Sequence, residues 1–173
     1  SPLRSRFSGG TFRLDFYSEE DIAKIVERSS LMLGVSADKS AITEISKRSR
    51  STPRTANYLL KRCRDFAQVN KTPLSLDVVR KALSLLEIDN LGLTSTDRKI
   101  LDVIIGMFHG GPVGLNTIAT ALQEEEATIE EVNEPYLMQI GLLERTRQGR
   151  VATNKTYEHL GYDLPSDRQE KLL

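Results

Sequence analysis

A two-stranded hairpin is predicted near the end of a chain whose other patterns are helical. Residues 142–153, LLERTRQGRVAT, form two short segments around a Gln148–Gly149 turn, which is typical of a β-hairpin. Three amphipathic helices are predicted before it, at 96–108, 116–123 and 128–141. Three helices followed by a hairpin is the order of a winged-helix domain, with the hairpin as the wing.

The first half of the chain has a different helical rhythm. Apolar residues at helical spacing, together with capping signals, predict four short amphipathic helices, at 18–34, 40–47, 51–66 and 75–86. Four such helices within about 70 residues describe a small helical bundle. Residues 87–93, EIDNLGL, are the predicted linker between this bundle and the winged helix.

The N-terminal residues carry a strand pattern instead. Phe12, Leu14 and Phe16 alternate with other residues in the stretch TFRLDFY, 11–17, which predicts a strand. No partner strand is visible close by in the sequence. We therefore expect this strand to end a sheet whose other strands precede Ser1.

Composition excludes several classes of protein. The 173 residues are 39% hydrophobic and 28% charged, as in a globular domain rather than a disordered chain. No apolar run approaches the ~18–20 residues that cross a bilayer. Cys63 is the single cysteine, which excludes an internal disulfide and, with two histidines, a zinc site. A reducing, cytoplasmic setting without membrane contact is expected.

The sequence does not support self-contained catalysis. A phosphate-binding loop of the Walker A type needs a Gly-Lys pair, and no glycine in this chain is followed by lysine. His109 and His159 have no nucleophile or acid spaced around them, so we interpret both as ordinary turn or surface histidines. The 24 basic and 24 acidic residues cancel, so any binding to nucleic acid must be local.

Arg54 is misplaced electrostatically. It directly follows Pro53, which fits the first position of the helix at 51–66, and Ser51 or Thr52 can cap that helix. A helix N-terminus carries partial positive charge, so a cation there is unfavourable unless an anion joins it. The functional interpretation is an arginine aimed at a phosphate. The alternative is a surface arginine whose stem covers apolar atoms.

Arg4 and Arg6, in SPLRSRF, admit the same two interpretations. Near a chain end, two arginines are ordinarily solvated charges. Close to the end of a strand and an adjoining bundle, they can instead reach the nucleotide of a neighbouring subunit, as arginine fingers do.

Charge is divided unequally within the predicted winged helix. The helix at 128–141 is predicted to begin with a Thr128/Glu131 capping box and to end at Gly141. Six glutamates gather in and before it, namely Glu124, Glu125, Glu126, Glu130, Glu131 and Glu134. The hairpin carries Arg145, Arg147 and Arg150. If the domain touches DNA, the wing makes the contact and the acidic helix faces away from it; a generic charged hairpin is the alternative.

Motifs in both halves resemble one family. SPLRSRF, RSRSTPRTANYLLKRCRDFA, TDRKIL, GGPVGLNTIATALQEE, TIEEVNEPYLMQIGLLERT and GRVAT occur in this order. Together they are similar to the C-terminal half of the bacterial RuvB Holliday-junction branch-migration ATPases. The resemblance implies a mainly α fold: the end of a large AAA+ ATPase domain (1–16), a four-helix AAA+ lid (17–90), a winged helix with a β-hairpin wing (91–162) and a flexible tail (163–173).

The resemblance also implies a function. It indicates part of an ATP- and Mg²⁺-dependent motor that assembles as a homohexamer on duplex DNA. With RuvA, such a motor drives branch migration of Holliday junctions in recombination and repair, and RuvC resolves the junction. Because the ATPase core is absent from this sequence, the chain alone is expected to be an inactive monomer.

Individual positions carry roles by resemblance. Arg6 matches the arginine finger that acts on the ATP of the adjacent subunit. Arg54 matches the sensor arginine of the lid, and Tyr17 matches a position that lines the nucleotide. Arg145 and Arg150 match positions of the wing that contact DNA.

Three departures from the family pattern stand beside these matches. The loop after Arg6 is one residue longer than usual. Glu126 stands where a basic residue is common, so a third DNA contact is not expected. Ser51 replaces the commoner glycine of GTPR.

Two other functions remain open from the residues alone. One is a non-enzymatic winged-helix regulator with a helical oligomerisation domain, which would bind duplex DNA without nucleotide dependence. The other is a different AAA+ assembly, such as a clamp loader or a replication initiator. Both share parts of the architecture but not the wing motifs quoted above.

Overall fold

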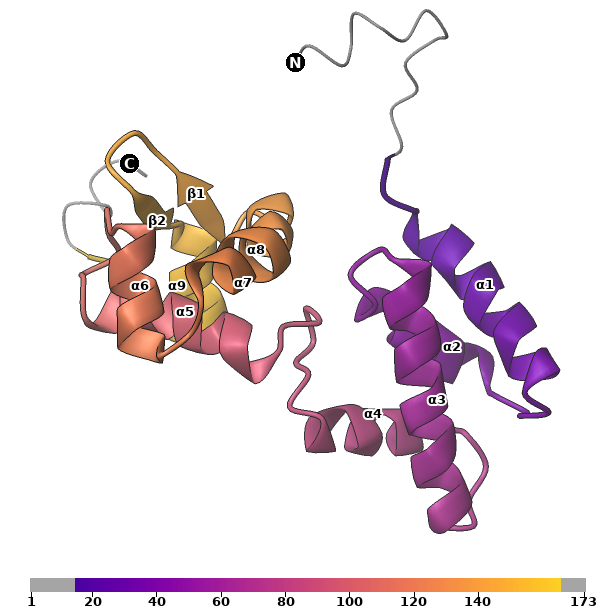
Figure 1. Cartoon of the computed structure of the whole chain (residues 1–173). Coiled ribbons are helices and arrows are strands. Elements are labelled where there is room, and N and C mark those ends of the chain that lie inside the picture. The colour runs from indigo at the N-terminus through magenta and orange to yellow at the C-terminus, as the bar shows by residue number, and fades with distance from the viewer. Residues whose placement is uncertain (1–14, 166–173) are drawn as a thin grey trace, which may run out of the picture. The chain divides into compact units, whose positions relative to one another are not determined.

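A computed structural model describes residues 15–165 of the chain. The chain divides into two compact units between Ala82 and Leu83. Figure 1 shows the N-terminal unit in indigo to magenta and the C-terminal unit in pink to yellow. Both units are mainly helical.

Four helices follow one another from residue 19. They are α1 (Glu19–Met32), α2 (Lys39–Lys47), α3 (Pro53–Val69) and α4 (Leu76–Leu85), whose last turn passes the division between the units. The four helices predicted from the sequence are therefore confirmed. α1 begins as its sequence predicts, because the hydroxyl of Ser18 accepts a hydrogen bond from the backbone N–H of Asp21 at 3.1 Å.

The core of the N-terminal unit is built where α1, α2 and α3 meet. Its fully buried side chains include Ile22 and Val26 of α1, Ile45 of α2, and Leu59 and Leu60 of α3. The segments before α2 and α4 are joined at Leu74, whose carbonyl accepts from the N–H of Asp38 at 3.2 Å. This packing fixes the N-terminus of α3 in the unit.

The C-terminal unit contains the predicted hairpin and more helical segments than expected. Its elements are α5 (Ser95–Gly106), α6 (Leu115–Leu122), α7 (Glu126–Thr128), the π-helical segment η2 (Ile129–Asn133), α8 (Glu134–Gln139), β1 (Leu143–Arg145), β2 (Arg150–Ala152) and α9 (Asn154–Leu160). The predicted fold class, a helical bundle followed by a winged helix, is confirmed.

The hairpin is held near its turn by the loop after α5. β1 and β2 pair antiparallel, with Arg145 opposite Arg150. Val113 and Arg150 exchange two backbone hydrogen bonds, of 3.0 and 2.8 Å. The approach is so close that a Cβ on Gly149 would lie 2.5 Å from the carbonyl oxygen of Val113. The segment 109–115 thus contributes a short third strand-like contact to the wing.

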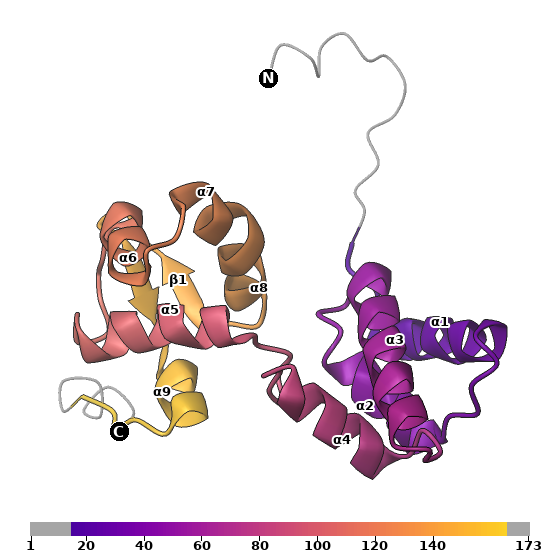
Figure 2. The ribbon, with the colours of Figure 1, turned by 60° about the horizontal axis from the view of Figure 1, so that its bottom comes forward.

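α5 is the central helix of this unit. In Figure 2 it runs between the hairpin on one side and α9 on the other. Ile100, Leu101 and Ile104 of α5 are fully buried in a core that Ile118, Ile129 and Leu137 complete. Helix α9 was not predicted; its Tyr157 closes this core with 2% of its surface exposed.

The predicted start of the helix at 128–141 is wrong. Thr128 has helical dihedral angles and makes no capping bond, because the helical run already begins at Glu126 after Glu125 as N-cap. The carbonyl of Glu125 accepts from the N–H of Ile129 at 3.2 Å. The C-terminal boundary is right, since Gly141 adopts a positive φ of 74° directly after the helix.

Most of the predicted N-terminal strand, 11–17, including Phe12 and Leu14, lies outside the described residues. Residues 15–18 have no regular secondary structure. Phe16 and Tyr17 are 61% and 50% exposed. Two neighbouring aromatic side chains therefore stand open to solvent just before α1.

Candidate functional site

The N-terminus of α3 lacks a side-chain cap. Thr52 occupies the N-cap position and Pro53 the first helical position, as the sequence predicts. The hydroxyl of Thr52, however, lies 2.8 Å from the hydroxyl of Thr55 and 3.3 Å from the carbonyl oxygen of Ser49, the two partners available to its one proton. It accepts no backbone N–H, so this end of α3 keeps its partial positive charge uncompensated.

Arg54 adds a full charge to this helix end. Its side chain is exposed and, within residues 15–165, makes no hydrogen bond or ion pair. An uncapped helix N-terminus beside an unpaired guanidinium suits a phosphate group, which accepts bonds from both.

Unusual backbone geometry precedes α3. Arg50 and Ser51 both adopt positive φ angles, 56° and 53°. An L-residue with a Cβ pays for this conformation, and glycine does not. Ser51 therefore stands at a position where glycine would have a conformational advantage.

A hollow of about 220 Å³ lies beside this helix start. It is lined by Asp15, Phe16 and Tyr17 on one side and by Ser51, Thr52 and Pro53 on the other. The structure thus brings Tyr17 next to Thr52 and Pro53, the two residues directly before Arg54, whereas Arg54 itself does not line this hollow. An aromatic ring and a proline flank a space close to an open helix N-terminus, an arrangement that can receive a planar base next to a phosphate chain.

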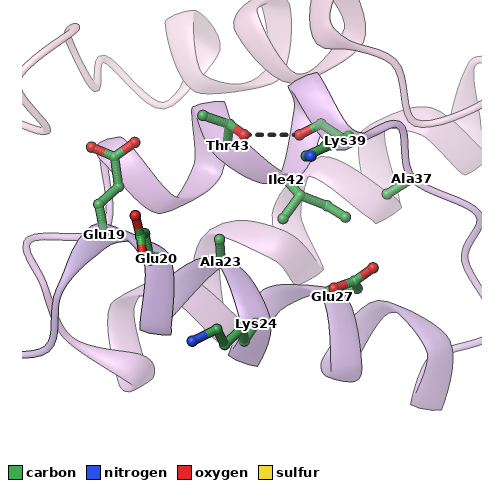
Figure 3. A pocket seen from close by; sticks show the side chains of 9 residues that line it. All are labelled: Glu19, Glu20, Ala23, Lys24, Glu27, Ala37, Lys39, Ile42 and Thr43. Carbon is green, nitrogen blue, oxygen red and sulfur yellow. Dashed lines mark hydrogen bonds between the residues drawn. The ribbon is translucent and has the colours of Figure 1, made fainter.

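A larger groove of the same unit contains none of the predicted site residues. It lies between α1 and α2, as Figure 3 shows, with Ala23 and Ile42 among its apolar lining residues. Its charged residues are mixed in sign, namely Glu19, Glu20, Lys24, Glu27 and Lys39. We assign it no role.

Arg145 lies on the wing and pairs with the acidic helical segment. Its Nη1 donates to Oε1 of Glu130 in η2 at 2.8 Å. Both side chains are about half exposed, at 51% and 43%. The predicted DNA contact is therefore at the surface, but its charge is shared with a carboxylate.

Arg150 is buried although it lies next to the turn of the wing, as the first residue of β2. Its Nε and Nη2 donate to the two oxygens of Glu134 at 2.6 and 3.2 Å, and Glu134 is 2% exposed. The hydrogen bond that Arg150 donates to Glu134 raises the pKa of Arg150 above its ordinary value, and the nearby charges of Glu134, Glu130 and Glu126 add to this. The DNA contact predicted for Arg150 stays a prediction. Two nitrogens of its guanidinium already donate to Glu134.

Three glutamates of the acidic segment share one face. Glu126, Glu130 and Glu134 are spaced by four residues, so they follow one another along a helical surface. Glu130 and Glu134 bind wing arginines, and Glu126 accepts from Nδ2 of Asn116 at 2.8 Å.

Arg147, in the turn between β1 and β2, is exposed and makes no hydrogen bond or ion pair within the described part of the chain.

Sequence reasoning missed a cluster around Asp89. One oxygen of Asp89 lies 2.8 Å from Nε2 of His159, and the other accepts from the N–H groups of Leu91 and Leu93 at 2.9 and 2.8 Å. His159 is therefore not an ordinary surface histidine. No local pattern signals this contact, because α9 brings His159 to a residue far away in the sequence.

The predicted site residues nearest the N-terminus are not part of the described structure. Arg4 and Arg6 lie outside the described residues. Within residues 15–165, no set of three or more His, Cys, Asp or Glu side chains is arranged to hold a metal ion. Among the helices of that same range, none combines the length and the apolarity needed to cross a membrane.

The fold and the two arginine sites define a class. A helical lid with an open helix N-terminus, followed by a winged helix with a basic wing, is the C-terminal architecture of an AAA-type ATPase that carries a winged helix. Two family models agree: the RuvB AAA lid domain matches residues 17–89 and the RuvB C-terminal winged helix domain matches residues 90–161. The chain belongs to the RuvB family.

Individual relatives agree with this assignment. The Holliday junction branch migration complex subunit RuvB of Dehalococcoides mccartyi is 52% identical over 172 residues, which is 99% of this chain and 49% of that protein. The subunit of Chloroflexus aggregans is 52% identical over 95% of this chain and 47% of its own length. The chain therefore spans about half the length of these relatives.

A solved structure has the same fold. The Thermotoga maritima RuvB Holliday junction branch migration motor superposes with a TM-score of 0.90 at 47% identity. The match covers 95% of this chain and 55% of that one.

Proposed function

We propose that the whole protein is an ATP-driven motor that moves Holliday junctions along DNA during recombination and repair. The names of the most similar relatives support this proposal. The motor works in the cytoplasm as a ring of six copies on duplex DNA. It cooperates with RuvA, and RuvC resolves the junction afterwards.

In this motor the N-terminal unit contacts ATP of its own subunit. The observation that carries the proposal is the N-terminus of α3, where Thr52 makes no capping bond and Arg54 has no hydrogen bond or ion pair within residues 15–165. The hollow of Tyr17 adjoins Thr52 and Pro53, directly before Arg54. The residues present fit part of a nucleotide: Arg54 and the free N–H groups would hold phosphate oxygens, and Tyr17 would contact the remainder. ATP with Mg²⁺ supplies the phosphoryl transfer that drives movement.

Two further proposals concern the rest of the nucleotide site. Arg6 acts in trans, as an arginine finger on the ATP of the neighbouring subunit. The present sequence lacks a Walker A motif. The 173-residue chain alone is thus expected to be monomeric, to bind ATP weakly and not to hydrolyse it.

The wing supplies the DNA contact. Arg145 is exposed and can donate to a phosphate, while Arg150 could reach DNA only with the part of its guanidinium that Glu134 does not occupy. These contacts position the duplex and read no sequence, because phosphates are the same at every step.

ATP hydrolysis by the full-length protein tests the proposal. Arg54→Ala is expected to lower the DNA-stimulated rate about 10- to 100-fold, the effect of removing one hydrogen bond between charged groups. Lys61→Ala is the matched control, since Lys61 is an exposed cation of the same helix without a hydrogen bond or ion pair in the described part of the chain. Equal rates for both variants and the unmodified protein would remove Arg54 from the nucleotide site.

A further inference from the structure

The acidic face of the η2–α8 region is turned toward the wing. Glu130 and Glu134 lie four residues apart and each binds a wing arginine. The Oε1 atom of Glu130 is 2.8 Å from Nη1 of Arg145 and 4.0 Å from Nη2 of Arg150. One carboxylate therefore lies within ion-pair distance of two wing cations.

The two pairs differ in exposure, and this difference separates their roles. The Arg150–Glu134 pair is buried, with side chains 10% and 2% exposed, so opening it would leave a charge without solvent or partner. The Arg145–Glu130 pair is about half exposed, and water can replace either partner. Only the second pair can open at low cost.

We propose that Glu130 competes with DNA phosphate for Arg145 and so limits the affinity of the wing for DNA. This inference rests on the proposed function, in which the wing contacts DNA. Nη1 of Arg145 already donates to a carboxylate, so a phosphate must displace Glu130 or approach beside it. If the phosphate displaces Glu130, the ion pair between Glu130 and Arg145 is lost. If it binds Arg145 beside Glu130, the phosphate and the carboxylate repel each other.

The remaining cations of the wing make this competition matter. Arg150 is held by Glu134, and Arg147 is the wing arginine that has no hydrogen bond or ion pair within residues 15–165. With Arg145 shared, the wing offers a phosphate about one freely available positive charge. Removing the carboxylate of Glu130 would roughly double that supply.

The proposal is tested by measuring the affinity of the 173-residue chain for a labelled DNA duplex. Fluorescence anisotropy at low salt reports the binding. Glu130→Gln is expected to tighten binding about two- to fivefold, the range that corresponds to an exposed ion pair. Glu131→Gln is the matched control: it removes the same charge from the adjacent exposed residue, which has no hydrogen bond or ion pair in the described region.

A third variant makes the test specific to Arg145. In an Arg145→Ala background, Glu130→Gln should have no more effect than Glu131→Gln, because the competed cation is gone. Equal tightening by Glu130→Gln and Glu131→Gln in the unmodified chain would overturn the proposal and leave only general charge repulsion. Weaker binding by Glu130→Gln would overturn it as well.

Failure of the proposed function gives a different result. If Arg145→Ala and Arg147→Ala both bind the duplex as the unmodified chain does, the wing is not the DNA contact. The proposed competition between Glu130 and phosphate is then wrong too. If Arg145→Ala weakens binding but Glu130→Gln and Glu131→Gln act alike, the wing binds DNA and the competition alone is wrong. Unfolding curves of each variant confirm that the fold is retained.

Discussion

His159 and Asp89 are 70 residues apart in the sequence, yet Nε2 of the histidine lies 2.8 Å from Oδ2 of the carboxylate. Asp89 also organises its own segment through the N–H groups of Leu91 and Leu93. The carbonyl of Leu91 in turn accepts from the hydroxyl of Tyr136 at 2.6 Å. The segment predicted as a linker is therefore bound to the winged helix at several points.

Removing the histidine of this pair is expected to destabilise the winged helix. His159→Asn should lower the free energy of unfolding by about 1 kcal/mol, the net value of one hydrogen bond. Asp89→Ala should lower it by about 2–3 kcal/mol, because three bonds are lost. Urea unfolding measures both. His109→Asn is the control, since His109 is exposed and without such a contact in the described residues; it should change stability by less than about 0.5 kcal/mol.

Loss of the buried Arg150–Glu134 pair is expected to destabilise the fold more strongly than loss of the Asp89–His159 pair. Arg150→Ala or Glu134→Ala should each cost about 3–5 kcal/mol, because the remaining charge is buried without its partner. The double change Arg150→Met with Glu134→Leu should recover most of that loss. Arg147→Ala, which removes an unpaired exposed cation, should leave the unfolding midpoint nearly unchanged. A loss below about 1 kcal/mol for Arg150→Ala would contradict the burial of its charge.

The positive φ of Ser51 predicts opposite effects for two substitutions. Ser51→Gly should raise the free energy of unfolding by about 0.5–1 kcal/mol, since glycine adopts this angle without steric cost but loses more chain entropy. Ser51→Val should lower it by more than about 1 kcal/mol, because a β-branched residue is poorly tolerated there. Ser84→Gly in α4 is the control and should be destabilising by about 0.5–1 kcal/mol. Thermal unfolding distinguishes the signs.

Cys63 is expected to be chemically inert in the folded protein. It is fully buried, and burial raises the pKa of its thiol to about 12. A disulfide reagent at pH 8 should react at least about 100-fold more slowly than in denaturant, because reaction requires unfolding. Rapid reaction of the folded chain would contradict this burial.

The same thiol predicts a loss of stability in alkali. The unfolded thiol loses its proton near its ordinary pKa of 9.0, whereas the folded thiol keeps it up to about 12. Between these values the unfolded state binds fewer protons, so the free energy of unfolding falls as pH rises, by at most about 4 kcal/mol. The difference in stability between the unmodified chain and Cys63→Ala should shrink across this range, which chemical unfolding at several pH values can follow.

Local patterns predicted most of the fold because they depend on neighbours in sequence. The apolar spacing of Leu59, Leu60 and Cys63 identified the buried face of α3, and the turn at Gln148–Gly149 identified the hairpin. The capping pattern at Thr128 predicted the wrong helix start, since such a pattern cannot reveal that a helical run has already begun at Glu126. α9 was missed because its seven residues carry few apolar positions.

The candidate site divides in the same way. The place of Pro53 at the first helical position and the exposure of Arg54 agree with the sequence, but the side-chain cap expected from Ser51 or Thr52 is wrong, because the hydroxyl of Thr52 bonds to Ser49 and Thr55 instead of to a backbone N–H. The burial of Arg150 could not be anticipated, because it depends on Glu134, which a different element brings against the wing. The three wing arginines, Arg145, Arg147 and Arg150, look alike in the sequence but differ in burial and pairing in the structure.

Under the proposed function, the pairing of two of the three wing arginines also determines how firmly one copy would hold DNA. Each phosphate neutralised contributes about one unit to the salt dependence of binding, so a wing with one freely available cation should bind with a shallow salt dependence and release quickly. Firm attachment then requires several copies on the same duplex, whose linked contacts raise the effective concentration of each. In such an assembly any single wing can release and rebind while the others remain in place.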